Sequence, residues 1–308
     1  MTSTAPVVGR AAVLAALALV FNALVWGTSW WPFRWLQAAG LHPLWATALI
    51  YTLASAVILA VRPRAFGQVL RTPALWLLVA AAGTTNAAFN WGVVIGDVVR
   101  VVLLFYLMPL WTVLLARLLL GERFTAAAAL RTVLALVGAA IVLWPEGSAD
   151  AADLARRLPL PRSLADWLGV VGGFSFAFNN VMLRREAARP EEGRALAMFL
   201  GGAIVAAAVA GVLTANGQVR WPASAAAGWL LPVAGMTVVF LAGNLALQYG
   251  AARLAANRTS VVMLTEVVFA SASAIALGGG TLTARVALGG GLIVASALLA
   301  ALTPAEHH

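Results

Sequence analysis

The 308-residue sequence has no cysteine and no lysine, and only 10% of its residues are charged. Without cysteine, the chain forms neither disulfides nor thiolate metal sites. A soluble domain carries roughly 25% charged residues, so the low charge together with 62% hydrophobic residues excludes an ordinary soluble protein. The composition therefore predicts an all-α integral membrane protein, because lipid-exposed backbone is satisfied within helices.

Several chemical signatures are also missing. The sequence contains no nucleophile elbow, no His-Glu-x-x-His pair and no glycine-rich phosphate loop. The apolar segments lack paired carboxylates, so we expect no enzyme, no metal and no cofactor. The net charge of +9 comes from arginines that flank apolar segments instead of forming a patch interleaved with aromatic residues. Nucleic acid is therefore not an expected partner, and the lipid bilayer is.

Hydropathy predicts ten transmembrane helices. A helix needs about 20 apolar residues to cross the hydrocarbon layer of a bilayer. The predicted segments are residues 10–32, 43–61, 73–96, 98–120, 125–144, 164–184, 195–214, 224–249, 254–278 and 281–302.

The arginines give these segments an orientation. If the N-terminus is placed on one side, thirteen of the twenty arginines fall on that side. The positive-inside rule makes this side cytoplasmic, so we expect a multi-pass protein with both termini cytoplasmic.

A short phrase occurs twice in the chain. Residues 86–92 read Asn-Ala-Ala-Phe-Asn-Trp-Gly, and residues 244–250, 158 positions later, read Asn-Leu-Ala-Leu-Gln-Tyr-Gly. A repeat of five helices must insert its two copies in opposite orientations, because five is odd. We therefore predict two inverted five-helix repeats, residues 1–145 and 164–304, joined by an extracytoplasmic linker at 146–163.

Polar side chains within the apolar segments are the candidate substrate-binding residues. Several are spaced by four, so each pair shares one helix face. An unpaired amide in hydrocarbon costs several kcal/mol, so these groups must face protein or water. They either line a central cavity or hold helices together. The candidates are Asn22, Trp26, Asn86, Asn90, Tyr106, Phe176, Asn180, Asn244 and Gln248.

Two further residues have special positions. Glu266 is the one carboxylate well inside an apolar segment, so it is a candidate proton or ammonium site, or a structural acid. Its mate in the repeat is Met108, which breaks the symmetry. Pro109 lies in the middle of the segment at 98–120 and removes one backbone hydrogen bond, so a kink or hinge is expected there.

Five short stretches of the sequence follow a familiar pattern. They are Trp-Gly-Thr-Ser-Trp at 26–30, Leu-Met-Pro-Leu-Trp at 107–111, Leu-Gly-Glu-Arg-Phe-Thr at 120–125, Val-Gly-Ala at 137–139 and Leu-Thr-Glu-Val-Val-Phe-Ala at 264–270. With these stretches the sequence resembles the EamA-type branch of the drug/metabolite transporter superfamily. Val267 stands where that family often has proline, and Gly279-Gly280 stands where it has Gly-Glu. The long linker and the aromatic first helix look most similar to amino-acid exporters of the YddG type.

That resemblance implies export of neutral and aromatic amino acids across a bacterial inner membrane, and we expect this export to proceed by alternating access. It also implies a basket of eight helices around a central cavity, with the fifth and tenth outside. We expect amino acids as substrates and a monomer or a weak homo-oligomer. The alternatives are an exporter of other small metabolites or of cationic drugs, and, from a different class, a membrane sensor or scaffold that transports nothing.

Overall fold

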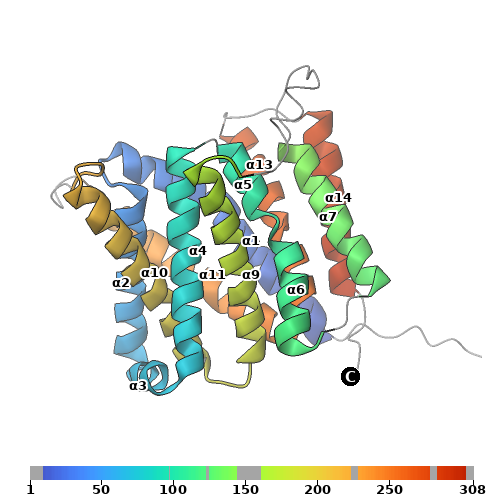
Figure 1. Cartoon of the computed structure of the whole chain (residues 1–308), viewed down its shortest axis with the longest axis horizontal. Helices are drawn as coiled ribbons and strands as arrows, with labels where there is room; N and C mark the ends of the chain where they lie inside the picture. The colour runs from blue at the N-terminus through green and yellow to red at the C-terminus, as the bar shows by residue number, and fades with distance from the viewer. Residues whose placement is uncertain are drawn as a thin grey trace, which may run out of the picture.

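The computed structural model describes residues 10–96, 98–122, 125–143, 161–222, 228–277 and 283–302, and these form helices and short connections without strands (Figure 1). The helices are α1 (Arg10–Ala38), α2 (Pro43–Val61), α3 (Arg64–Arg71), α4 (Pro73–Ile95), α5 (Val98–Phe105), α6 (Met108–Leu120), α7 (Ala126–Leu143), α9 (Leu164–Arg185), α10 (Glu191–Ala215), α11 (Leu230–Arg253), α12 (Ala256–Met263), α13 (Thr265–Ala276) and α14 (Ala284–Leu302). The all-helical prediction is confirmed for these residues.

Each predicted segment coincides with one helix or with two helices in series. By length and composition, six helices in the described part of the chain can cross a membrane, or seven if α3 and α4, which meet at a bend of 98°, count as one span. The count of ten spans therefore stays a prediction. Residues 146–160 of the predicted linker lie outside the described residues.

The first segment is longer than expected, because α1 continues through Pro32 to Ala38. Gly40 then adopts a left-handed φ of 86° and ends the helix, while the Leu41 N–H donates to the Leu36 carbonyl at 2.9 Å. Two residues on, Pro43 starts α2, and its N-cap His42 accepts a hydrogen bond from the Leu44 N–H at 3.3 Å through Nδ1.

The segment at 98–120 is interrupted at Tyr106 and Leu107, and α6 begins with Pro109 in its first turn. This position suits proline, since the first turn of a helix has no partner for a backbone N–H. The helix is interrupted there, and Pro109 lies in the first turn after the interruption instead of in the middle of a helix. A similar interruption separates α12 from α13 at Leu264. Whether either interruption acts as a hinge stays a prediction.

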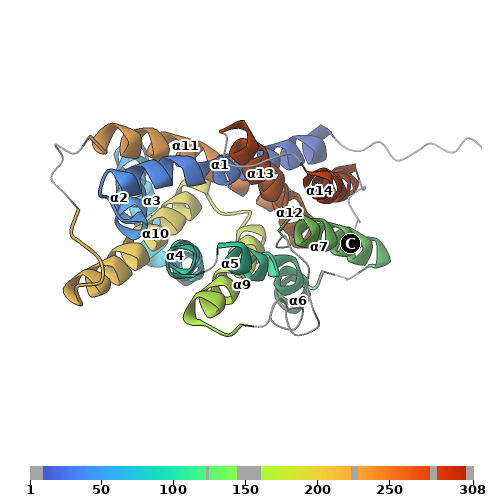
Figure 2. The same ribbon diagram turned by 90° about the horizontal axis from the view of Figure 1, so that it is seen from above.

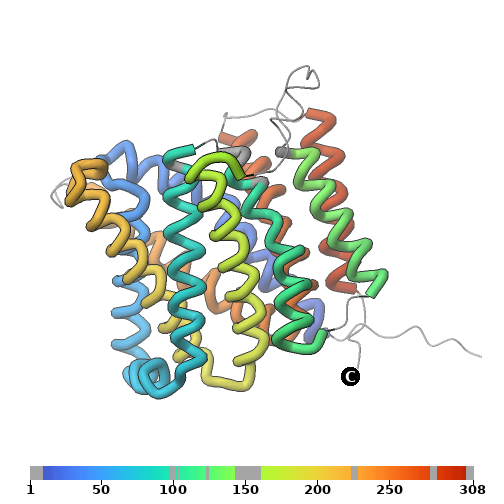
Figure 3. Tube along the Cα trace, in the orientation of Figure 1, coloured from blue at the N-terminus to red at the C-terminus, as the bar shows by residue number. Residues whose placement is uncertain are grey.

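The helices pack in pairs at close range. α4 contacts α9 and α10, α1 contacts α11 and α13, and α6 contacts α9. α7 and α14 pack against each other at one edge of the bundle, as Figures 2 and 3 show. Glycines permit the closest approaches: a Cβ at Gly201 of α10 would lie 2.1 Å from the carbonyl oxygen of Val79 on α4.

The outer surface of the bundle is apolar. Large side chains such as Leu118, Leu231 and Val238 are 69%, 82% and 67% exposed. Exposed apolar area on this scale belongs in contact with lipid and not with water. Together with the long apolar helices, it indicates an integral membrane protein.

Candidate functional site

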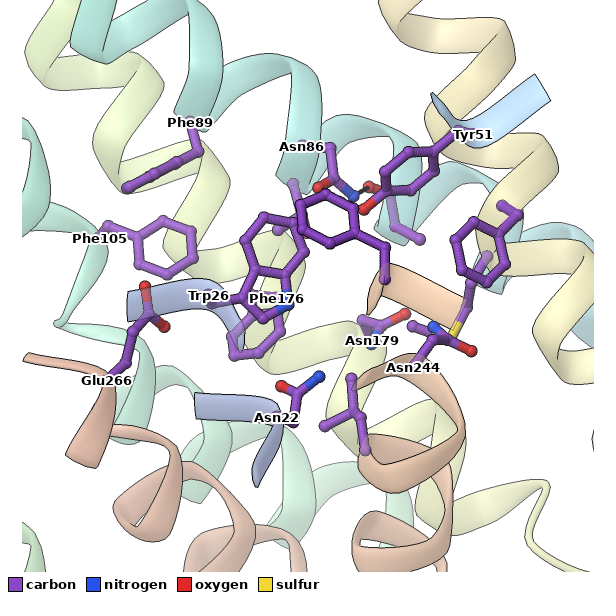
Figure 4. Close-up of a pocket in the computed structure, with 16 residues that line it drawn as sticks. Asn22, Trp26, Tyr51, Asn86, Phe89, Phe105, Phe176, Asn179, Asn244 and Glu266 are labelled. Carbon is purple, nitrogen blue, oxygen red and sulfur yellow. Dashed lines mark hydrogen bonds between the residues drawn. The ribbon is translucent and has the colours of Figure 1, made fainter. Parts of the chain in front are cut away.

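A central cavity lies between the helices of both halves of the chain (Figure 4). α1, α2, α4 and α5 supply one part of its wall, and α9, α10, α11 and α13 supply the other. None of its lining residues comes from α7 or α14. The lining residues are Asn22, Trp26, Tyr51, Ala82, Thr85, Asn86, Phe89, Phe105, Phe176, Asn179, Met198, Phe199, Phe240, Asn244, Leu247 and Glu266.

Aromatic rings form most of the wall in two groups. In the first group, Trp26 stacks on Phe240 with ring centroids 4.8 Å apart, and Tyr51 lies 5.0 Å from Phe199. In the second group, Phe105 lies 4.8 Å from Phe89 and 5.7 Å from Phe176. Ring pairs at these distances are mutually stabilising, so the walls are partly preorganised for an apolar or aromatic part of a ligand.

Polar groups interrupt the aromatic wall at defined points. The Tyr51 hydroxyl donates to Asn86 Oδ1 at 2.9 Å, and Asn86 Nδ2 donates to the Ala82 carbonyl at 2.7 Å. Figure 4 shows the Tyr51–Asn86 pair facing the cavity. On the opposite half, Asn244 Oδ1 accepts from Gln248 at 2.8 Å. These bonds fix the orientation of both amides.

Two amide oxygens at the cavity have no donor in the described part of the chain. Asn22 donates through Nδ2 to the Gly243 carbonyl at 2.8 Å, but its Oδ1 has no hydrogen-bond partner. Oδ1 of Asn179 also lacks a partner. Both side chains are 1% exposed. A buried acceptor without a donor costs about 1–3 kcal/mol, so the site is suited to a ligand or water that supplies N–H or O–H groups.

Glu266 brings the one carboxylate of the lining to the cavity. It lies in the first turn of α13, where the positive end of the helix dipole favours a negative charge. The Tyr106 side chain hydrogen-bonds to it. Tyr106 itself is 4% exposed and lies behind the lining, so it orients the carboxyl group without lining the cavity.

The structure separates the residues proposed from the sequence into two sets. Asn22, Trp26, Asn86, Phe176, Asn244 and Glu266 line the cavity, whereas Asn90, Tyr106, Asn180 and Gln248 do not. Asn90 instead donates to the Thr47 hydroxyl at 2.6 Å and so joins α4 to α2.

Sequence reasoning missed most of the aromatic wall. Phe89, Phe105, Phe199 and Phe240 look like ordinary core residues in an apolar helix, and no sequence signal distinguishes them. Tyr51 offered a signal, because the chain has three tyrosines and this one lies in the middle of an apolar segment.

The cavity is narrow in this structure. The space within it that can hold the centre of a water molecule is about 60 Å³. At roughly 10–15 Å³ per water, this is room for about four to six water molecules.

Comparison with known proteins finds a family similarity within the first half of the chain. Residues 13–144 match the EamA-like transporter family. A crystal structure of a protein 20% identical in sequence superposes with a TM-score of 0.71 over 93% of this chain and 96% of that chain, which shows a shared fold. No curated protein matches the sequence significantly. The family match covers less than half of the chain.

Proposed function

We propose that the protein is a secondary transporter that exports neutral and aromatic amino acids by alternating access through the central cavity. The observation that carries this proposal is the composition of the cavity wall: aromatic rings, amides with unpaired oxygens and a single carboxylate, contributed by both halves of the chain. A site between two halves of a membrane bundle is the usual position for the substrate of a carrier.

The inverted repeat has structural support beyond the sequence phrase. The interruption at Tyr106 and the one at Leu264 are 158 residues apart, the same offset that separates Asn86 from Asn244. The helix contacts also follow the pattern expected for two halves related by a two-fold axis. The contact of α1 with α11 corresponds to that of α9 with α4, and the contact of α1 with α13 corresponds to that of α9 with α6.

The chemistry of the wall selects the class of substrate. Asn22 Oδ1, Asn179 Oδ1 and the Glu266 carboxyl are acceptors, which suit an ammonium group. Amide N–H groups remain to donate to a carboxylate. Among the described residues that line the cavity there is no arginine, so a sugar phosphate or a nucleotide sugar lacks cationic partners there.

A second candidate function has specific support. Trp26 and the phenylalanine rings beside Glu266 form a wall that also suits an organic cation, since ring faces attract positive charge. Export of cationic drugs is therefore the alternative, and competition between a quaternary ammonium compound and an amino acid for transport separates the two.

The test is flux in proteoliposomes. The reconstituted protein should show saturable uptake of a labelled neutral amino acid, and we expect Glu266→Gln to lower the response of this flux to an imposed proton gradient. Asn180→Ala serves as a comparison, because Asn180 lies outside the lining. Absence of saturable flux for every amino acid would favour a sensor or scaffold. A response to the proton gradient that is as large in Glu266→Gln as in the unmodified protein would remove the proton-site hypothesis.

We also propose ten spans with both termini cytoplasmic. The chain has no cysteine, so a single introduced thiol reports its own side of the membrane without background. Ala5→Cys and Ala305→Cys should be labelled from the cytoplasmic side, and Ser148→Cys in the linker from the opposite side. Labelling of Ala5→Cys and Ala305→Cys from opposite sides would contradict this topology.

A further inference from the structure

The short helix α3 crosses the end of the bundle instead of running along it. It meets α4 at a bend of 98°, and Figure 1 shows it nearly end-on below α2, at the lower end of the bundle. A helix that lies across the end of membrane-spanning helices lies in the plane of the membrane surface. No residue of α3 lines the central cavity, so the transport proposal assigns it no role.

One face of α3 is buried and fixes the helix to the bundle. Ala65 and Val69, which are 0% and 1% exposed, form this face, and α3 packs against α10. Beside them, Gln68 Nε2 donates to Glu192 Oε1 at the start of α10 at 3.1 Å. α3 is therefore a fixed part of the bundle, and its other faces keep a constant orientation.

The other faces of α3 are apolar and basic. Phe66 and Leu70, four residues apart, are 49% and 53% exposed and share one side of the helix. Arg64 and Arg71, two turns apart, are exposed and share another side. Gly67 lies between these two sides, and a Cβ there would meet nothing within 4 Å. Adjacent apolar and basic faces are typical of helices that bind at a membrane surface.

The charge around α3 is of one sign. Residues 61–72 contain three arginines and no acidic residue. Arg62 lies close enough to Glu192 on α10 for their charges to attract each other, so we assign Arg62 no further role. In the described part of the chain, no hydrogen bond or ion pair engages Arg64 or Arg71. Their flexible side chains can reach phosphate groups at the membrane surface.

The start of α4 strengthens this positive region. Thr72 is the N-cap of α4, but its side chain makes no capping hydrogen bond. The positive end of the α4 dipole is therefore open beside Arg71. Trp76, in the first turns of α4, is 46% exposed, and tryptophan is enriched where the hydrocarbon layer meets the headgroups.

We propose that α3 and the start of α4 form a binding site for an anionic phospholipid. The guanidinium groups of Arg64 and Arg71 bind the phosphate, because their planar donors match phosphate oxygens. Phe66 and Leu70 lie against the acyl chains next to the headgroup. The open space at Gly67 receives the glycerol part of the lipid. A soluble phosphate ester uses the arginines alone, whereas a phospholipid uses the apolar face as well.

The first experiment measures which lipids stay bound to the purified full-length protein. The protein is placed in nanodiscs of phosphatidylcholine and phosphatidylglycerol in equal parts and extracted into mild detergent, and each retained lipid is counted by native mass spectrometry. Arg64→Gln or Arg71→Gln should lower the ratio of retained phosphatidylglycerol to phosphatidylcholine by about fivefold, the contribution of one arginine at an anionic surface. The double variant should lower it further.

Two further variants separate charge from apolar contact. Arg220→Gln is the matched control, since it removes an exposed arginine beyond the far end of α10, and it should leave the ratio unchanged. Phe66→Ala removes apolar contact and no charge, so it should lower the retention of both lipids by a similar factor.

The second experiment measures the depth of α3 and uses no arginine variant. The chain has no cysteine, so Gly67→Cys can carry a single nitroxide label, and the open space there accommodates it. Electron paramagnetic resonance with oxygen and a nickel chelate as relaxing agents gives the depth of the label. It should lie at the level of the headgroups.

Each outcome decides the proposal. A lower ratio in the Arg64 and Arg71 variants, with an unchanged ratio in Arg220→Gln and a label at headgroup depth, supports it. An unchanged ratio in the double variant overturns it. Equal losses in Arg64→Gln and Arg220→Gln also overturn it, because the effect then follows net charge. A label in bulk water shows that α3 does not reach the lipid and contradicts the proposal independently. Neither experiment includes a transport substrate, so failure here leaves the transport proposal intact.

Discussion

A glycine contact between α4 and α10 offers a sharp test of how the bundle holds its cavity. A Cβ added at Gly201 would lie 2.1 Å from the Val79 carbonyl oxygen and 3.0 Å from the Gly83 nitrogen. Ordinary contact begins at 3.4 Å, so the two backbones must separate by about 1.3 Å. Backbone on a packed helix does not rotate away as a side chain does. We therefore expect Gly201→Ala to lower stability by about 1–3 kcal/mol, even after the gain in helix propensity.

Gly211 is the control on the same helix. A Cβ there meets nothing within 4 Å, so Gly211→Ala keeps only the helix-propensity gain of up to about 1 kcal/mol. Thermal unfolding in detergent should give a clearly lower Tm for Gly201→Ala and an equal or higher Tm for Gly211→Ala. Equal Tm values for the two variants would refute the close packing of α4 on α10.

The same change should reach the cavity. α4 carries Asn86, whose Oδ1 accepts a hydrogen bond from Tyr51 on α2. A shift of α4 away from α10 alters this pair, so Gly201→Ala should also raise the apparent KM of transport. Gly211→Ala should leave KM unchanged.

Three further predictions concern single side chains. Asn90→Ala loses the bond to Thr47 and should lower stability by about 1–3 kcal/mol without changing apparent KM, because Asn90 lies outside the lining; Tm and flux measure the two effects. Burial lowers the pKa of His42, so the folded protein favours the neutral ring and Tm should fall as pH drops below about 6.5, a step that His42→Gln should remove. Trp26→Ala removes a wall of the cavity, and in competition assays it should weaken recognition of aromatic amino acids more than that of small ones.

The helices themselves could be predicted from the sequence, because hydrophobic runs of sufficient length define them without reference to their neighbours. Their ends were harder to predict. α1 passes through Pro32, the last residue of the predicted segment, and stops two residues before Gly40 with its left-handed backbone. The interruption at Leu264 has no proline or glycine to mark it.

The site could be predicted only in part, since the direction in which a side chain faces depends on helix packing. Asn86 and Asn90 share a face of α4 and were equivalent in the sequence. In the structure, Asn86 reaches the cavity and Asn90 reaches Thr47. Helical periodicity predicts that the two residues share one face of the helix, but it does not predict which neighbouring group each of them contacts. The aromatic wall is less predictable still, because a phenylalanine in an apolar helix carries no sign of facing a cavity.

Glu266 and Tyr106 connect the repeat to the proposed mechanism. The offset of 158 residues aligns Tyr106 with Leu264 and Met108 with Glu266, so both residues lie at the two matched interruptions. Both halves have the helix interruption, but each half has one ionisable side chain there and the two occupy different positions: Tyr106 in the first half and Glu266 in the second. The Tyr106–Glu266 hydrogen bond joins the two interruptions. If the halves move against each other during alternating access, this bond is one of the contacts that the motion must stretch or keep. In the proposed mechanism, loss or gain of a proton at Glu266 changes the strength of this hydrogen bond, and we propose this change as the link between protonation and the motion of the two halves.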